Sequence, residues 1–143
     1  MAINATRSGT AAESFALSRE LRERIVAHAR EASPNEACGL LAGHPGAATR
    51  VIRCANVHET PTTRYRIDPR EQLRAFREMD DRNEELVAIY HSHPASQPYP
   101  SPTDRAESHY PDAVYVLVSL RAAEPEVRGF RIDEDAVREV RLV

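Results

Sequence analysis

A continuous apolar run of five residues, Leu86–Tyr90, is followed directly by a His-Ser-His sequence. Such a run is typical of a central strand covered on both faces, as in a sheet flanked by helices. Because side chains alternate between the two faces of a strand, His91 and His93 point to one side and Ser92 to the other. The run therefore predicts a core strand whose end carries two imidazoles to a single site.

A carboxylate, Asp104, follows the histidines after a proline-rich loop that is short enough to fold back. Two imidazoles and one carboxylate suit Zn²⁺ and leave a fourth position for water. Each part also has an ordinary explanation, since His-x-His alone is a weak signal. Ser101 and Asp104 would equally form a capping box at the start of a short helix. The metal site is therefore predicted from the combined spacing.

An isolated acid, Glu36, opens a short apolar segment that ends at Ala42 and is followed by a turn at residues 43–46. This segment predicts another strand. Alone, Glu36 indicates nothing about chemistry. Its interest lies in the joint pattern of an acid opening a strand far upstream of the His-x-His sequence and the Ser-x-x-Asp sequence.

The remaining elements follow from periodicity and turn signals. An amphipathic helix is expected over residues 17–32, and a second helix begins at Asp68 and Pro69 with Leu73, Phe76 and Met79 as its buried stripe. A short helix should run from Ser101 toward His109. Further strands are expected over residues 50–56, 114–120, 126–132 and 136–143, the last two joined by an acidic turn at 133–135. Together these predict an α/β (α+β) fold with two or three helices around a mixed sheet of five or six strands.

The length of 143 residues suits one domain, expected over residues 17–143 after a flexible tail of residues 1–16. A net charge of −3 gives no basic balance of the kind that binds nucleic acid or an anionic membrane. We find no signal peptide and no apolar stretch of the roughly 20 residues that a membrane span needs. Cys38 and Cys54 lie in apolar runs and suit a reducing compartment, so a cytoplasmic location is expected.

The joint pattern of Glu36, His91-Ser92-His93, Ser101 and Asp104 resembles the JAMM motif of the MPN family of zinc metallopeptidases, and every position of that motif is present. The sequences at residues 35–43, 90–93 and 99–104 look especially like a small bacterial branch of the family. The resemblance implies an MPN/JAB1 (cytidine-deaminase-like) fold.

The resemblance also implies roles for these residues. His91, His93 and Asp104 would hold one Zn²⁺ per chain, Glu36 would act as general base, and Ser101 would donate a hydrogen bond to the developing oxyanion. The substrate implied is a ubiquitin-like sulfur-carrier protein ending in Gly-Gly, cleaved after its last glycine. Release of cysteine, in cysteine biosynthesis or a related sulfur transfer, is the reaction expected.

Two alternatives stay open on the sequence, namely a non-catalytic MPN-type binding module and a RadC-like DNA-associated protein. The carrier, the leaving group, the choice between peptide and isopeptide bonds and the oligomeric state are also open. Cys38 is a conceivable extra ligand, although core packing is the commoner role of a free cysteine. Arg64 and Tyr65 could line a groove for the carrier's tail, although a solvated Arg and a half-buried Tyr are commoner.

Overall fold

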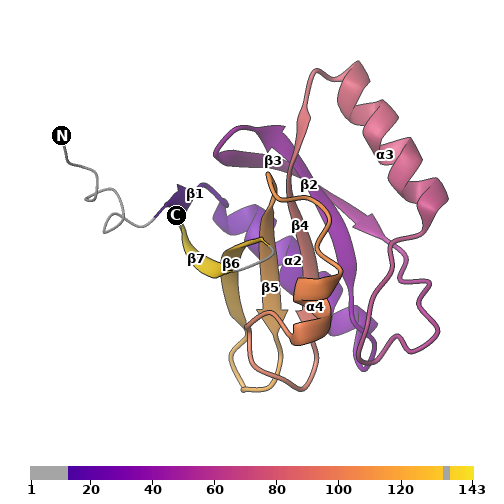
Figure 1. Ribbon diagram of the computed structural model, residues 1–143, viewed down its shortest axis with the longest axis vertical. Helices are drawn as coiled ribbons and strands as arrows, with labels where there is room; N and C mark the ends of the chain where they lie inside the picture. Colours follow the sequence, from indigo (N-terminus) through magenta and orange to yellow (C-terminus); the bar gives the residue numbers. More distant parts are fainter. Residues whose placement is uncertain (1–12, 134–135) are drawn as a thin grey trace.

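The computed structural model describes residues 13–133 and 136–143, in which one mixed sheet runs through the molecule (Figure 1). The sheet has seven strands in the order β1-β7-β6-β5-β4-β2-β3. β4 pairs with β5, and β1 with β7, in parallel, and the other pairs are antiparallel. The strands are β1 (Ser14–Phe15), β2 (Cys38–His44), β3 (Ala47–Cys54), β4 (Glu85–His93), β5 (Val114–Ser119), β6 (Glu126–Ile132) and β7 (Val137–Leu142).

The extra strand beyond the five or six expected is β1, which lies inside the segment expected to be a tail. Phe15 is 2% exposed, and Ala16 forms a bridge with Ala47, so β1 connects β7 to the far edge of the sheet. The carboxylate of Glu13 binds Arg131 and Arg138 at 2.7 and 3.0 Å. The expected tail was therefore wrong for residues 13–16, because burial of Phe15 and backbone pairing order this segment. Residues 1–12 lie outside the described residues.

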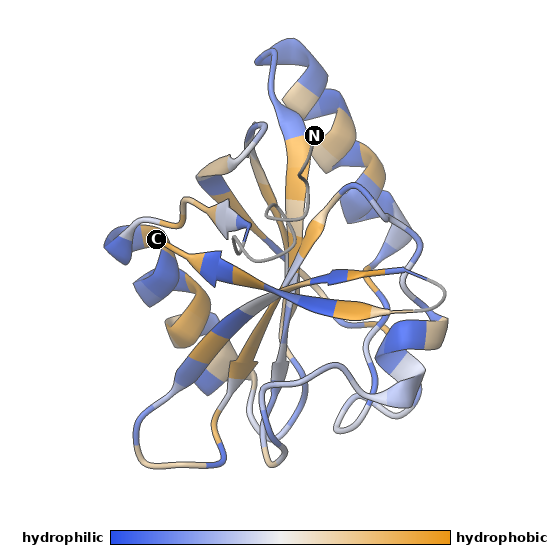
Figure 2. Cartoon of the chain, turned by 60° about the vertical axis from the view of Figure 1, so that its left-hand side comes forward, coloured by the Kyte–Doolittle hydropathy of each residue, from blue (hydrophilic) through white to orange (hydrophobic). Residues whose placement is uncertain are grey.

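One face of the sheet is covered by α2 (Arg19–Ala32), which begins after Ser18, whose side chain accepts the N–H of Leu21. Leu21, Ile25 and Ala29 are buried against the α2-facing side chains of the strands, including Tyr90. Apolar residues concentrate along the strands and on the inner side of α2 (Figure 2). This confirms the expected amphipathic helix.

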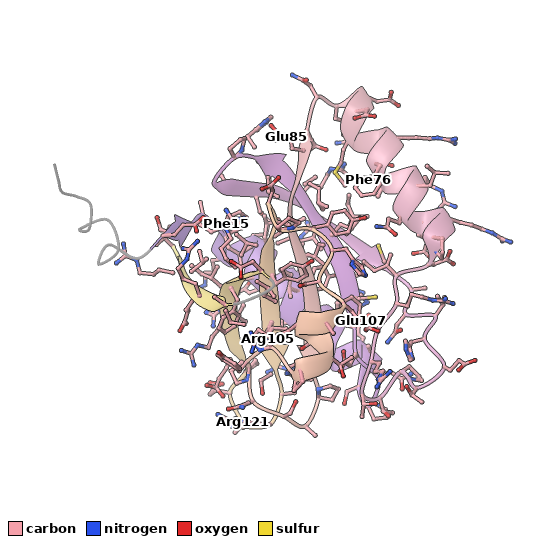
Figure 3. The ribbon with its side chains drawn as sticks, viewed as in Figure 1. Phe15, Phe76, Glu85, Arg105, Glu107 and Arg121 are labelled. Carbon is pink, nitrogen blue, oxygen red and sulfur yellow. The ribbon has the colours of Figure 1, made fainter. Side chains whose placement is uncertain are left out.

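The opposite face carries α3 (Pro69–Asp81) and the short α4 (Pro102–Ala106). Asp68 caps α3 as expected, and Phe76 and Met79 pack toward the sheet (Figure 3). Leu73 does not, since 53% of it is exposed. The expectation of a buried Leu73 was wrong because Ala75 and Met79 determine the buried side, and at about 3.6 residues per turn Leu73 lies far around the axis from both.

Several boundaries also differ from expectation. β2 begins at Cys38, so Glu36 precedes the strand instead of opening it, whereas β4 ends with both histidines as expected. β3 ends at Cys54, and Asn56 forms a separate bridge with Ile67. β6 and β7 form the expected pair, although part of their acidic turn lies outside the described residues. Within residues 13–133 and 136–143, no helix has the length and apolar character needed to cross a membrane.

Candidate metal centre

The C-terminal end of β4 and the start of α4 bring His91, His93 and Asp104 together. The two histidines are 1% and 4% exposed and lie on the sheet face opposite α2. Asp104 Oδ2 is 3.2 Å from His91 Nε2 and 3.0 Å from His93 Nε2. One potential ligand atom from each residue falls within 4.8 Å of the others. The group predicted as metal ligands is therefore assembled in space.

Asp104 is placed by the capping box that the sequence also indicated. The Ser101 hydroxyl oxygen accepts the N–H of Asp104 at 3.0 Å, and Asp104 Oδ2 accepts the N–H of Ser101 at 2.9 Å. Pro102 occupies the first helical position. The capping box and the metal group therefore coexist, because the cap determines where the carboxylate points.

The donor chemistry of this cluster fits a metal cation. His93 Nδ1 lies 2.7 Å from the carbonyl oxygen of Gln97, which can only accept, so Nδ1 carries a proton and Nε2 is the ligating atom. Neither ring nitrogen of His91 has a hydrogen-bond partner among the described residues, even though its Nε2 is close to Asp104. A buried imidazole without partners is costly, and a cation among these atoms would satisfy it.

The pKa values follow the same arrangement. Burial lowers the pKa of His91, and this effect outweighs the attraction of Asp104. Burial alone would also lower the pKa of His93, but bonds to Asp104 and to Gln97 raise it. Burial opposes ionisation of Asp104, yet both histidines and the Ser101 N–H hold its pKa well below its usual range. Asp104 therefore carries the negative charge that a metal ion would neutralise.

Glu36 lies beside this cluster. Its side chain is 5% exposed, and its Oε1 has no hydrogen-bond partner among the described residues. Burial raises the pKa of Glu36 to about 8, with His93 lowering it and Asp104 raising it by smaller amounts. The next residue, Ala37, exchanges hydrogen bonds with Ser92 at 2.8 and 3.0 Å. Ser92 points away from the histidines, as expected, and anchors the segment that carries Glu36.

A loop that we call the strap, residues 57–66, covers the site. Tyr65 stacks on His91, with ring centroids 4.4 Å apart and an interplanar angle of 23°. Asn56 bonds both to the backbone of Glu36 and to the strap. No sequence signal marked Asn56 beyond its place at the end of an expected strand.

A groove with a volume of about 630 Å³ runs beside the cluster. Tyr65, which touches His91, and Ile89, two residues before it on β4, connect the groove to the cluster. Of the two residues considered for a groove, Tyr65 lines it and Arg64 does not, and the neighbour of Tyr65 there is Arg66. The other lining residues come from the strap and the residue after it, from α3, from the segment between α4 and β5, and from β5, namely His58, Glu59, Ile67, Gln72, Glu107, His109, Tyr110 and Tyr115. Figure 3 shows Glu107 at the end of α4.

Cys38 lies outside the metal group. It is fully buried in the core cluster on the α3 side, and its Sγ is 3.8 Å from the carbonyl oxygen of Cys54. Burial raises the pKa of the Cys38 thiol to about 12. Since the thiolate is the metal-binding form, this thiol serves as packing.

Comparison with known proteins identifies close relatives of the chain. It is 47% identical over 123 residues to the CysO-cysteine peptidase of Mycobacterium tuberculosis, covering 84% of each chain. It is 40% identical over 125 residues to a probable TtuB-protein conjugate cleaving protease of Thermus thermophilus, covering 87% of this chain and 79% of that one. A desampylase of Haloferax volcanii is 36% identical over 111 residues, covering 73% and 80%.

Solved structures and a family model agree with these relatives. The solution structure of a protein from Desulfitobacterium hafniense matches with a TM-score of 0.83 and 34% identity, covering 90% of this chain and 91% of that one. A JAB1/MPN domain protein from Archaeoglobus fulgidus, 16% identical, matches with a TM-score of 0.58 over 91% of this chain and 98% of that one, which confirms the expected fold. The family described as prokaryotic homologs of the JAB domain matches residues 18–133. The chain therefore belongs to the JAB/MPN family.

Proposed function

We propose that this protein is a zinc-dependent peptidase or isopeptidase that hydrolyses the bond after the C-terminal glycine of a ubiquitin-like sulfur-carrier protein. The observation that carries the proposal is a buried carboxylate, Glu36, whose Oε1 has no hydrogen-bond partner in the described part of the chain, beside a cluster of two histidines and an aspartate. An acid whose pKa is raised by burial suits proton transfer near neutral pH.

The relatives support this reaction class. Their names describe a peptidase acting on a carrier-cysteine adduct, a protease for carrier-protein conjugates, and a desampylase. They give no support to a non-catalytic binding module or to a DNA-associated protein. Since the first of these relatives has the highest identity, we propose cysteine as the leaving group.

His91, His93 and Asp104 would hold the ion, which we propose is Zn²⁺. When bound there, Zn²⁺ would polarise the scissile carbonyl and lower the pKa of a water molecule to about 7. Glu36 would take a proton from the attacking water and return it to the leaving amine nitrogen, so that one side chain serves both proton transfers.

Ser101 would stabilise the oxyanion. Its Oγ already accepts the N–H of Asp104, which leaves the hydroxyl hydrogen available to donate. Such a donor, held in place before the reaction, acts most strongly on charge that develops in the transition state. The helix cap therefore prepares Ser101 for this role.

We propose that the groove lined by the strap, α3 and the segment between α4 and β5 receives the carrier's extended tail. Tyr65 and Ile89 border the groove next to the histidines. Glycines at the end of the tail would let the backbone approach the site closely, since they carry no side chain. A tail ending in Gly-Gly is therefore the substrate end that suits this route.

The folded body of the carrier would then rest on the outer face of α3. Leu73, 53% exposed, lies next to Gln72, which lines the groove. Arg70, Arg74 and Arg77 make no ion pair with a carboxylate of residues 13–133 or 136–143. A cationic face around one apolar side chain suits an acidic partner surface with an apolar centre.

The direct test is incubation of the zinc-loaded protein with two substrates: a Gly-Gly-ending carrier joined to cysteine, and the same carrier joined to a lysine side chain. Mass spectrometry should show loss of cysteine from the first. Cleavage of only the second would favour an isopeptidase, and an unchanged mass for both would refute the proposal.

We place the reaction in the cytoplasm, which suits the free thiols of Cys38 and Cys54.

A further inference from the structure

The amide side chain of Asn56 joins the segment that carries Glu36 to the strap. Its Nδ2 donates to the carbonyl oxygens of Glu36 and Arg64, both at 3.0 Å, and to that of Pro61 at 3.5 Å. Its Oδ1 accepts the backbone N–H groups of His58 and Arg66 at 3.0 and 3.1 Å. Both halves of the amide are therefore engaged, Nδ2 with the segment of Glu36 and with the strap, and Oδ1 with the strap alone.

The Nδ2 side of this arrangement holds the backbone of Glu36 from two directions. Asn56 binds the carbonyl oxygen of Glu36, while the N–H of Glu36 donates to the carbonyl oxygen of Pro61 at 2.7 Å. Pro61 is itself a partner of Asn56. Glu36 precedes β2 and lies outside the residues that pair with β3 and β4. These two hydrogen bonds therefore hold its backbone in place of strand pairing.

The Oδ1 side shapes the strap. His58 and Arg66, whose N–H groups it accepts, both line the groove. Between them in the chain lies Tyr65, which stacks on His91. A change at Oδ1 would therefore displace the groove wall and the ring of Tyr65, which stacks on His91.

We propose that Asn56 is a positioning residue for the reaction, with Nδ2 placing the general base and Oδ1 placing the groove wall. This rests on the proposed function, in which Glu36 transfers the protons. The amide touches no reacting atom in this scheme. Its effect follows from geometry, because a displacement of about 1 Å in a reacting group can cost about 100-fold in rate.

Substitution by aspartate separates the two halves. Asn56→Asp keeps an acceptor for the N–H groups of His58 and Arg66 but loses the donors to the carbonyl oxygens of Glu36, Pro61 and Arg64. Asn56→Ala loses both. Asn35→Ala is a matched control, because Asn35 is exposed and adjacent to Glu36 in sequence, and its side chain makes no hydrogen bond to residues 13–133 or 136–143.

Three measurements test this: kcat and KM on the carrier-cysteine conjugate, zinc per chain, and hydrogen exchange at the backbone amides of Glu36, His58 and Arg66. For Asn56→Asp we expect full zinc content, fast exchange only at Glu36, and kcat lowered by about 10- to 100-fold with KM little changed. For Asn56→Ala we expect fast exchange at all three amides and a raised KM as well.

The proposal is overturned if Asn56→Asp keeps the kcat of Asn35→Ala, or if kcat falls while the Glu36 amide stays protected. A purely structural role would lower the melting temperature of both variants without changing kcat. If the parent protein cleaves no conjugate, the proposed function fails by itself. In that case, unchanged protection of the Glu36 amide in Asn56→Asp would still refute the placement of the base by Asn56.

Discussion

The ring of Tyr65 lies almost parallel to the ring of His91, with centroids 4.4 Å apart. This contact fixes the orientation of an imidazole that has no hydrogen-bond partner among the described residues. Groups that orient metal ligands typically change metal affinity by 10- to 100-fold when removed. We therefore expect Tyr65→Ala to lower zinc affinity about 10-fold, while Tyr65→Phe, which keeps the stacked ring, retains it. Competition with a chelator measures this, and equal affinities for both variants would contradict it.

Replacing Glu36 with glutamine should separate catalysis from metal binding. Glutamine has nearly the same shape but cannot transfer protons, so kcat should fall by about 100-fold or more. Zinc content should stay at one per chain, because in the proposed mechanism Glu36 acts on water while His91, His93 and Asp104 hold the ion. The variant should be at least as stable as the parent, because burial disfavours the charged form of Glu36. Loss of zinc in Glu36→Gln would show that Glu36 is a ligand.

Removing a ligand should release the metal without unfolding the protein. Asp104→Ala leaves His91 and His93 without their shared carboxylate, so we expect zinc per chain to fall close to zero. The two core clusters lie on the two faces of the sheet and are built from apolar side chains. Chelation should therefore leave the far-UV circular dichroism unchanged and lower Tm only modestly. Collapse of the fold on chelation would indicate a structural metal site instead.

The α3 face should affect substrate binding more than chemistry. Combining Leu73→Ser with Arg74→Glu removes the apolar centre and reverses one charge, so KM should rise about 10-fold with kcat unchanged. Tm should hardly change, because Leu73 is 53% exposed. Arg22→Glu is the matched control, since Arg22 is exposed on α2 at the other face of the sheet. An equal rise in KM for this control would indicate a general charge effect.

Acid should destabilise the protein through His28. Its Nδ1 lies 2.7 Å from the Tyr90 hydroxyl, and burial, reinforced by Arg53 and opposed by Glu31, lowers the pKa of His28. As the pH falls, His28 is therefore protonated in the unfolded chain at a higher pH than in the folded protein. The contribution of neutral His28 to the free energy of unfolding is complete above about pH 6.5, the ordinary pKa of histidine. It is lost as the pH falls through the lower pKa that His28 has in the folded protein.

Urea unfolding at several pH values between 5 and 8 measures this effect. His28→Gln should show a smaller acid-side loss of stability than the parent. His44→Gln is the control, because His44 is exposed at the end of β2. If the parent and His28→Gln lose stability equally between pH 7 and pH 5, the buried imidazole is not the source.

Much of the fold could be predicted from local sequence patterns. Period-3.6 spacing indicated α2, Asp68 and Pro69 marked the start of α3, and the apolar run before His91 indicated the central strand. Local signals misplaced what depends on distant partners. The segment at Phe15 is a strand because β7 pairs with it, and Leu73 is exposed because the sheet lies beneath a different side of α3.

For the candidate site, the sequence by itself determined the residue types and their order, because period-two alternation and the Ser101 cap are local properties of the chain. Only the tertiary structure decided how these parts meet. Pairing of β2 with β4 places Cys38 opposite His91 and so brings the segment of Glu36 to the histidines. Two long-range hydrogen bonds, from Asn56 to the carbonyl oxygen of Glu36 and from the N–H of Glu36 to Pro61, then join the strap to this segment, because these partners are adjacent in space and not in sequence.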